Sequence, residues 1–228
     1  MRVAISWSGG KDSCLATWYA RRQGLDVVFL LNAMYGQLHR VSFHGTRARH
    51  IVRQAEAMDL RLLQFPVPLD LAQYEAAFKR AVSKLQRIGV EGIVFGDIYL
   101  DEHRQWGERV ASEIGVTPYW PLWGRDTHEL LPEFIDAGFE AVVVAANVQY
   151  FREEWLGRRT DAQFQADIEQ LAGERGVDVC GERGEYHTLV IDGPLFRRRL
   201  AVTYGPRVQK DGYWMLDLPR GRLQPKRS

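Results

Sequence analysis

Short apolar runs alternate with amphipathic stretches through the first 96 residues, and this alternation constrains the fold more than any other feature. The apolar runs have the length of buried strands and cover residues 3–5, 27–31, 61–65 and 92–96. Between them, apolar residues recur at the three- and four-residue steps of a helix. These segments are residues 14–22, 48–58 and 71–88. A βαβα order predicts an α/β fold, with a parallel sheet covered by helices on both faces and ligands at the carboxyl ends of the strands.

The pattern changes near Gly124, where we expect a domain boundary. A further helix is predicted over 102–114, followed by a proline- and aromatic-rich stretch. Beyond the boundary we expect helices at 127–137, with Thr127 as N-cap, and at 161–174. The expected strands are 141–145, 188–191, 200–204 and 213–216, the last two as a hairpin. The prediction is a parallel-sheet domain over 1–123 and a smaller mixed α/β domain over 124–228, whose basic tail from Pro219 is expected to be disordered.

The segment Ser8-Gly9-Gly10-Lys11-Asp12-Ser13 joins the first strand to the first helix. Adjacent glycines let backbone N–H groups approach phosphate oxygens, and the start of the helix adds its positive dipole end. The P-loop of kinases and GTPases requires four residues between its glycine and a Gly-Lys-Ser/Thr ending, and that frame is absent. The alternative is an ordinary strand-to-helix turn that binds no ligand, but the placement of the lysine and the two serines favours an anion cradle.

Two more groups of polar residues follow strands of the same predicted sheet. Gly96 and Asp97 come after the fourth strand, so Asp97 is expected at the same edge as the cradle. Its carboxylate could hold Mg²⁺ on a triphosphate or orient a reacting group, or it could cap the next helix. His44 follows the second strand, where it could donate to phosphate or shuttle a proton, or be a polar loop residue.

A third cluster, Cys180 to Thr188, is dense in glycines and titratable groups. Glu182, Glu185 and His187 suit acid–base work on a substrate or an incoming amine. A polar turn before a strand would have the same composition, and both interpretations remain open on composition alone.

Composition excludes several classes of protein. Lysines and arginines number 30 and acidic residues 29, a net charge of +1, so no global field attracts nucleic acid or a membrane. The basic runs are short: 197–199 and the tail. Two cysteines, Cys14 and Cys180, lie far apart, which argues against disulfides and a zinc site and favours a reducing cytoplasm. Every apolar run is too short to cross a bilayer, so we expect a soluble cytoplasmic protein.

Taken together and in order, these clusters resemble a known family. Ser8 to Ser13 is similar to the PP-loop of ATP pyrophosphatases, which cut ATP between its α and β phosphates. With it occur Gly-Asp-Ile at 96–98, His-Arg-x-Trp at 103–106, Gly-Glu-x-Gly-Glu-Tyr at 181–186 and Asp-Gly-Pro-Leu-Phe at 192–196. This set, spanning roughly residues 1 to 200, resembles the diphthine-ammonia ligase family.

The resemblance implies a HUP-type nucleotide-binding domain, Rossmann-like in its layers, with a smaller C-terminal domain. It also implies a reaction in which ATP and ammonia convert a carboxylate into an amide, with AMP and pyrophosphate as products. The cofactors would be ATP and Mg²⁺. The acceptor would be diphthine on translation elongation factor two or a small carboxylate, without nucleic acid or membrane, and the chain could assemble as a homo-oligomer.

The resemblance assigns roles to particular residues. Lys11, Asp12, Glu182 and Glu185 would be catalytic, with Asp12 also carrying the metal. ATP would contact the cradle and its neighbours: Ser8, Gly9, Gly10, Lys11, Asp12, Ser13, His44, Gly96 and Asp97. The acceptor would meet His103, Arg104, Gly181, Gly184, Tyr186, His187 and Thr188. Glu182 and Glu185 could either hold the acceptor or take a proton from ammonium.

The chain departs from the family pattern at two positions. Diphthine enzymes typically read Gly-Glu-Gly-Gly-Glu-Tyr-Glu-Thr, whereas Arg183 and His187 stand here in place of a glycine and a glutamate. Nucleotide chemistry is therefore better supported than diphthine as the acceptor. Two rivals remain: a PP-loop enzyme that thiolates tRNA through a cysteine persulfide, and a non-catalytic adenine-nucleotide regulator.

Overall fold

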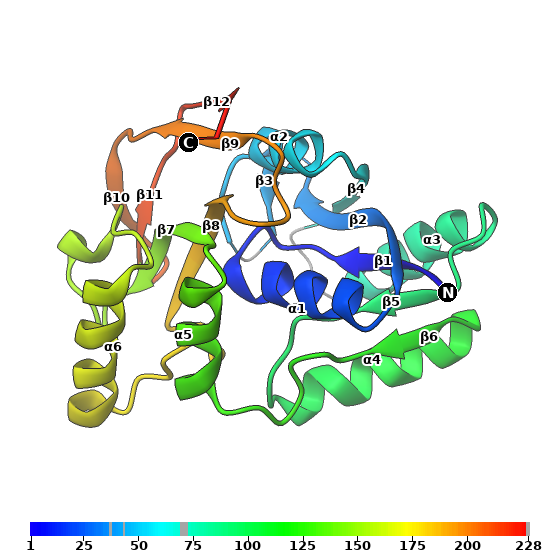
Figure 1. The fold of residues 1–228 in the computed structure, drawn as a ribbon, viewed down its shortest axis with the longest axis horizontal. Helices are drawn as coiled ribbons and strands as arrows, with labels where there is room; N and C mark the ends of the chain where they lie inside the picture. The colour runs from blue at the N-terminus through cyan, green and yellow to red at the C-terminus, as the bar shows by residue number, and fades with distance from the viewer. Residues whose placement is uncertain (37, 43, 69–72, 227–228) are drawn as a thin grey trace.

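A mostly parallel sheet forms the first half of the molecule (Figure 1). The computed structural model describes residues 1–36, 38–42, 44–68 and 73–226. The five parallel strands, in chain order, are β1 (Arg2–Ser6), β2 (Asp26–Tyr35), β4 (Arg61–Val67), β5 (Gly92–Val94) and β6 (Thr117–Tyr119). Their spatial order is β4-β2-β1-β5-β6, with the short β3 (Arg40–Val41) antiparallel to the end of β2. The predicted parallel α/β sheet is confirmed, and its order reverses at β1, which is where doubly wound sheets bind ligands.

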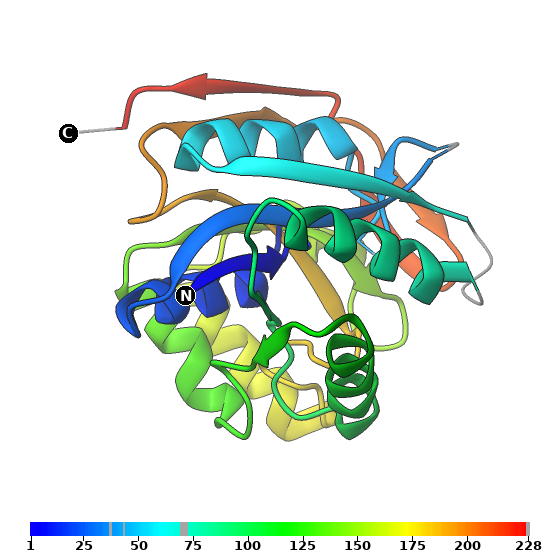
Figure 2. The ribbon, with the colours of Figure 1, turned by 90° about the vertical axis from the view of Figure 1, so that its right-hand side faces the viewer.

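Helices cover both faces of this sheet. They are α1 (Lys11–Arg22), α2 (Ala48–Met58), α3 (Tyr74–Gln86) and α4 (Asp101–Ile114). Apolar residues of α1 and α2 share one buried cluster with Val3 and Ile5, whereas those of α3 and α4 share another with Ala4. The pleat of β1 therefore separates two cores, and Figure 2 shows the molecule from the side on which α3 and α4 lie. The bounds of α2 are those the periodicity predicts, α1 begins three residues earlier, and residues 71–72 of the third predicted helix lie outside the described residues.

The second half is antiparallel and mixed with helices. Its elements are α5 (Thr127–Asp136), β7 (Glu140–Asn147), the 3₁₀ turn η2 (Glu153–Trp155), α6 (Ala162–Arg175), β8 (Tyr186–Asp192), β9 (Arg199–Thr203), β10 (Arg207–Lys210), β11 (Tyr213–Leu216) and β12 (Arg220–Gln224). One sheet has the order β10-β11-β7-β8, and β9 pairs with β12. A C-terminal antiparallel region of this kind agrees with the expected fold class.

Three local predictions are wrong. The strand at 213–216 pairs with β10 and β7, not with β9, because residues 207–210 form an additional strand of the hairpin. The expected disordered tail contains β12, which pairs with β9 from Arg220 to Gln224; residues 227–228 lie outside the described part of the chain. The N-cap of α5 is Asp126, whose carboxylate accepts from the amide of His128 at 2.9 Å, and Thr127 is the first helical residue.

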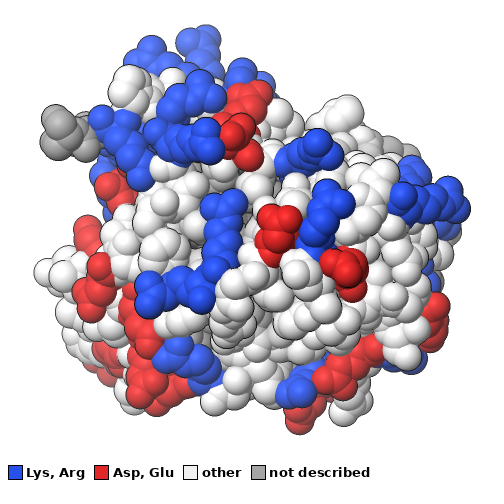
Figure 3. Space-filling model, turned by 45° about the vertical axis from the view of Figure 1, so that its right-hand side comes forward, with Lys and Arg blue, Asp and Glu red and all other residues white. Residues whose placement is uncertain are grey.

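Basic side chains gather beside the C-terminus, around β12 (Figure 3). β12 carries Arg220 and Arg222 and packs against α2, which carries Arg49 and Arg53. Acidic neighbours balance part of this charge, since Arg53 pairs with Glu56 at 2.7 Å. Among the described residues, no helix is both long and apolar enough to span a membrane.

Candidate functional site

The glycine loop after β1 is anchored by a buried glutamine from α2. Gln54 donates to the carbonyls of Gly9 at 2.9 Å and Val190 at 2.7 Å, and it accepts from the indole N–H of Trp7 at 2.9 Å. Gly9 has φ +88°, and a Cβ there would lie 2.5 Å from Ile51. Only glycine fits this turn, because it combines a left-handed conformation with close packing against α2.

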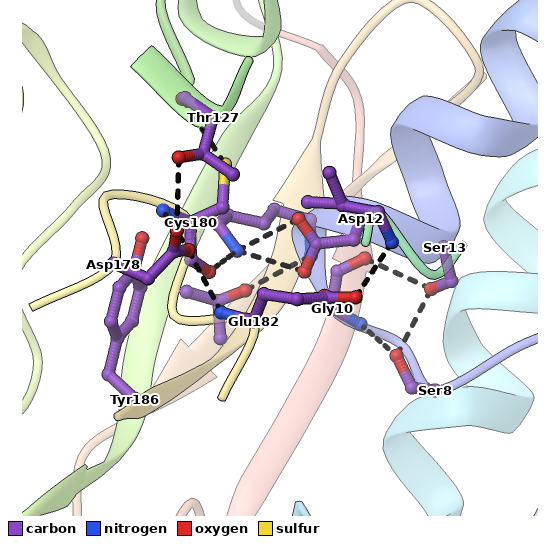
Figure 4. Close-up of polar contacts among 12 residues, drawn as sticks. Ser8, Gly10, Asp12, Ser13, Thr127, Asp178, Cys180, Glu182 and Tyr186 are labelled. Atoms are coloured by element: carbon purple, nitrogen blue, oxygen red, sulfur yellow. Dashed lines mark hydrogen bonds and ion pairs between the residues drawn. The ribbon is translucent and has the colours of Figure 1, made fainter. Parts of the chain in front are cut away.

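The side chain of Lys11 lies toward the C-terminal half of the molecule. Its ammonium contacts both carboxylate oxygens of Asp12, at 2.8 and 2.9 Å, and donates to the carbonyl of Cys180. Its amide donates to the hydroxyl of Thr188 at 3.0 Å. The nearby Asp12 carboxylate raises the pKa of Lys11 against the effect of burial, so the lysine is charged. Figure 4 shows this meeting of α1 with the 178–186 segment.

Two serine hydroxyls complete the loop. The Oγ atoms of Ser8 and Ser13 lie 3.2 Å apart. Ser8 Oγ accepts from the amide of Gly10 at 3.2 Å, and Ser13 Oγ donates to the carbonyl of Gly10 at 3.1 Å. Burial raises the pKa of Asp12. The loop thus presents one cation, one carboxylate and two hydroxyls at the positive end of a 12-residue helix.

The Gly-Asp-Ile segment after β5 packs directly on this loop. A Cβ at Gly96 would lie 2.9 Å from the amide nitrogen of Ser13, so the close approach of two backbones requires glycine. The next residue, Asp97, contacts Nδ1 of His103 at 2.7 Å, and this hydrogen bond raises the pKa of His103. Asp97 is therefore oriented by α4 rather than serving as its N-cap, which is Leu100.

Asp178 and two glutamates shape the third cluster. Asp178 Oδ1 accepts from the amides of Cys180 and Glu182 at 2.9 and 3.0 Å, and its other oxygen accepts from Thr127. Glu182 reaches across to accept from the amide of Ile98 at 2.7 Å, and burial raises its pKa to about 8. This bond joins the C-terminal segment to the Gly-Asp-Ile segment.

Glu185 is turned into its own loop. Its side chain is 3% exposed and accepts from the amides of Asp178 and Arg183, each at 3.0 Å. The guanidinium of Arg183 also pairs with it at 3.0 Å. The Glu185 carboxylate therefore stabilises its own loop and does not line the cavity.

Imidazoles form the wall beside the loop. The rings of His44 and His187 have centroids 4.5 Å apart, and His187 stacks on Tyr213 at 6.2 Å. Burial, reinforced by Lys11, lowers the pKa of His187 to about 4 and lowers that of His44 as well, so both are neutral at pH 7. In the described structure Nδ1 of His44 is buried without a hydrogen-bond partner.

These segments surround one cavity of about 870 Å³. Most of the predicted site residues line it: Ser8, Lys11, Asp12, Ser13, His44, Gly96, Asp97, His103, Gly181, Glu182, Gly184, Tyr186, His187 and Thr188. Gly9, Gly10, Arg104 and Glu185 lie outside this lining. Arg104 instead pairs with Glu108 at 2.6 Å and stacks over Trp123.

Sequence reasoning missed an aromatic part of the same cavity. Its rings are Phe65, Tyr74, Phe78, Phe95 and Trp106. Phe78 connects the group, with centroid distances of 6.3 Å to Tyr74 and 5.1 Å to Trp106. Such a wall suits a flat ligand such as a nucleobase. The Trp106 position was visible in the His-Arg-x-Trp motif, but the other rings come from three separate segments: β4, α3 and the residue that follows β5.

The residues present fit a metal ion that arrives with a nucleotide. No group of three or more potential protein ligands is gathered around a common point among the described residues. Mg²⁺ in phosphate-transfer sites needs only one or two carboxylates besides the phosphates. Asp12 and Asp97 both line the cavity and can supply them.

Both cysteines are free and buried. Burial raises the pKa of each thiol, and Sγ of Cys180 lies 3.5 Å from the carbonyl of Thr127. A reactive cysteine requires the opposite, a lowered pKa and access to solvent.

Comparison with known proteins covers almost the whole chain. Residues 1–118 match the model of the diphthamide synthase N-terminal domain, and residues 126–226 match that of the diphthamide synthase C-terminal domain. The chain is 31% identical to the diphthine–ammonia ligase of Homo sapiens, over 89% of this chain and 83% of that protein. For the diphthine–ammonia ligase of Danio rerio the identity is 28%, over 89% and 86%.

A crystal structure titled as a predicted subunit of a tRNA methyltransferase from Methanocaldococcus jannaschii superposes on 83% of this chain and 95% of its own, with a TM-score of 0.42 at 14% identity. Two matching domain models that together cover almost the whole chain and a relative at 31% identity show the family. The chain belongs to the diphthamide synthase family, whose curated relatives are diphthine–ammonia ligases.

Proposed function

We propose that this protein binds ATP in the cavity, adenylates a carboxylate and transfers ammonia to it. The observation that carries the proposal is the meeting of the PP-loop with the Gly181–Thr188 segment around Lys11 and Asp12. One cavity thus offers a phosphate cradle and an acceptor region. The N-terminal region to residue 123 would bind the nucleotide, and residues 124–228 would supply most of the acceptor contacts.

Adenylation is needed because a carboxylate oxygen is a poor leaving group. The carboxylate oxygen attacks the α-phosphorus of ATP, and the bond to the β-phosphate oxygen breaks, so pyrophosphate leaves. Ammonia then attacks the acyl carbon, loses a proton, and AMP departs with its oxygen. The products are amide, AMP and pyrophosphate.

The cradle residues would stabilise the charge that builds on pyrophosphate. The hydroxyls of Ser8 and Ser13 lie at the N-terminal end of α1, and both serines line the cavity. Lys11 would exchange its contact with the Cys180 carbonyl for a phosphate oxygen. A Mg²⁺ ion held by phosphate would find Asp12 or Asp97 as its protein ligand and would neutralise phosphate charge.

Glu182 and Glu185 receive different roles in this proposal. Glu182 lines the cavity and has a pKa of about 8, which suits a group that exchanges a proton with ammonium near neutral pH. Glu185 is a positioning residue, because its buried carboxylate organises the amides of Asp178 and Arg183. The acceptor itself would be diphthine on translation elongation factor two or a small carboxylate.

Labelled oxygen tests the reaction directly. The protein is incubated with Mg-ATP, ammonium chloride and carboxylates labelled with ¹⁸O, and the products are separated by mass spectrometry. One ¹⁸O atom is expected in AMP for each amide formed, because the acceptor oxygen leaves with the α-phosphate. Formation of ADP instead of AMP, or AMP without the label, contradicts the proposal.

Lys11→Met gives the matched test of the cradle, with Lys84→Met as its control. Lys84 lies on α3 outside the cavity lining. We expect Lys11→Met to lower AMP formation by at least about 100-fold, as losses of catalytic electrostatic groups do, and Lys84→Met to leave it unchanged. Binding of ATP by the wild-type protein without any AMP would favour the regulator instead.

A further inference from the structure

Strand β12 lies at the outer edge of the two-stranded sheet that it forms with β9. Figure 2 shows it as the outermost strand at the top of the molecule. It pairs with β9 from Arg220 to Gln224, and among the described residues no backbone group of β12 bonds to any other element. In an antiparallel ladder, alternate residues direct their N–H and C=O groups to opposite edges of the strand. The edge of β12 that faces away from β9 therefore presents unpaired donors and acceptors.

The side chains of β12 alternate between a packed face and an exposed face. A Cβ at Gly221 would lie 2.6 Å from Nδ1 of His50, and Leu223 packs against the main apolar core, so both positions face inward. Arg220 and Arg222 are exposed. Because side chains alternate along a strand, these two arginines share the outer face and lie two residues apart.

The two arginines carry charge that the protein itself does not balance. Among the described residues no ion pair involves either of them, whereas Arg53 on the neighbouring α2 pairs with Glu56 at 2.7 Å. Arg49 of α2 adds a third guanidinium beside the strand, where it donates to the carbonyl of Pro219. The net charge of the whole chain is only +1, so the basic side chains around β12 in Figure 3 are a local concentration.

The open edge and its charge together favour one kind of partner. Pairing with the same strand of a second copy would bring like charges together, which opposes it. A nucleic acid backbone would suit the guanidinium groups, but the unpaired carbonyls of the edge would repel its phosphates. An extended peptide offers donors and acceptors in alternation along its own edge, and acidic side chains on it would meet the arginines.

We propose that β12 binds an acidic, extended segment of a partner protein, which adds to the open edge as a third strand of the sheet. Residues directly opposite each other in neighbouring strands share a face, so acidic residues two apart on the partner would lie opposite Arg220 and Arg222. The site would thus recognise an alternating acidic pattern rather than negative charge alone. Both arginines lie outside the cavity lining, so the proposed binding does not depend on the ligase reaction.

Labelled peptides test the acidic pattern and the backbone pairing separately. The first, Ser-Glu-Thr-Glu-Thr-Glu-Ser, alternates glutamate with a residue that favours strands. The second has the same composition with its glutamates adjacent, and the third is the first peptide with its central amides N-methylated. Dissociation constants are measured by fluorescence anisotropy with the full chain in low-salt buffer. We expect the first peptide to bind at least about tenfold more tightly than either of the others, a difference of about 1.4 kcal/mol.

Charge reversal on β12 provides the matching change in the protein. The double variant Arg220→Glu/Arg222→Glu should bind the first peptide at least about tenfold more weakly and should instead bind its lysine counterpart, Ser-Lys-Thr-Lys-Thr-Lys-Ser. A reversed preference cannot come from unfolding, and both side chains are exposed. Arg80→Glu/Lys84→Glu is the control, because it reverses two exposed charges on α3 and should leave binding of the first peptide unchanged.

Equal binding of the alternating and adjacent peptides overturns the proposal, because charge alone would then suffice. Equal binding of the N-methylated peptide overturns it as well, since no third strand would form. Tighter binding of a uridine oligonucleotide with the same charge as the first peptide would replace the peptide with nucleic acid as the partner. No measurable binding of any peptide would leave the arginines only the role of preventing β12 from pairing with other copies, and the proposal would be wrong.

Discussion

Gln54 shows how one residue far from the reacting atoms holds the phosphate loop in place. Its amide is fully buried and satisfies Trp7, Gly9 and Val190 together. Gln54→Leu leaves the indole N–H of Trp7 without this partner and removes one hydrogen bond from each of the carbonyls of Gly9 and Val190, at about 1–3 kcal/mol for each lost contact. We expect the free energy of unfolding to fall by at least about 3 kcal/mol, measured by urea denaturation.

The control for this prediction is Gln86→Leu. Gln86 donates to the carbonyl of Ile114 at an exposed position, so its removal should change stability by less than about 0.5 kcal/mol. Equal losses for the two variants would show that the buried amide of Gln54 is not an anchor.

Glu182 makes stability depend on pH. Its pKa is about 8 in the folded protein against 4.5 for an ordinary glutamate. Between these values the folded state keeps the proton that the unfolded state has lost, so the free energy of unfolding falls as pH rises from about 4.5 to about 8 and then levels off. Glu182→Gln removes this contribution.

Urea unfolding of both proteins at pH 5, 6.5 and 8 measures the difference in stability between them. We expect the wild-type protein to lose stability relative to Glu182→Gln across this range, because only the carboxyl group ionises. Parallel curves would show that Glu182 is ionised in the folded state. The hydrogen bond from Ile98 is retained by the glutamine oxygen, so the comparison isolates the charge.

At the scale of single residues, the sequence indicated which side chains belong to the candidate site but not which side chains hold them in place. Lys11, Asp12 and Glu182 were identifiable because their motifs are local in sequence. Gln54 anchors the loop through partners that lie 45 or more residues away in the sequence. Asp178 acts through the conformation of its own loop. A lone glutamine in an amphipathic helix carries no signal of such contacts.

Among the elements, β12 is a strand formed by a polar segment whose sequence does not predict one. It pairs with β9 over five residue pairs, and Gly221 packs on the imidazole of His50. His50 accepts or donates through Nε2 to the carbonyl of Leu218 at 2.7 Å. A Cβ at Gly221 would lie 2.6 Å from Nδ1 of His50, so Gly221→Val should cost about 1–3 kcal/mol through overpacking.

Gly173 is the contrasting glycine. It lies in α6 with open space around its Cβ position, so Gly173→Ala should stabilise the protein by up to about 1 kcal/mol through helix propensity. Thermal unfolding of Gly221→Val and of Gly173→Ala, each compared with the wild-type protein, tests both expected changes in stability. A neutral effect of Gly221→Val would mean that β12 separates easily from α2.

Elements with a strong period were predictable, whereas strand partners were not. The bounds of α2 follow from its apolar spacing alone. The pairing of β9 with β12 spans a hairpin, and β12 reads Arg-Gly-Arg-Leu-Gln, which lacks the apolar alternation of a strand. Its pairing depends on the surface that β9 and α2 offer, which composition does not reveal.

In the whole molecule, one apolar core crosses the expected boundary near Gly124. It joins Ile5 and Leu15 to Val142 and Leu189, from β1 and α1 through β7 and β8. Polar links run beside it: Val190 donates to Gly9 at 2.9 Å, and Arg47 pairs with Asp217 at 2.7 Å. The two halves therefore share the contacts that would have to break on unfolding.

We expect a single cooperative unfolding transition for the full chain, because neither half can expose its side of this core without losing the other's contacts. Intrinsic tryptophan fluorescence and far-UV circular dichroism in urea should give the same midpoint. Met substitutions at Val142 and Leu189, on the C-terminal side of the core, should lower that midpoint for both probes alike. Separate midpoints for the two probes would instead identify two independently unfolding units on either side of Gly124. The cavity would then depend on the docking of these units, and ATP analogues would raise the midpoint at higher urea concentration more than the one at lower concentration.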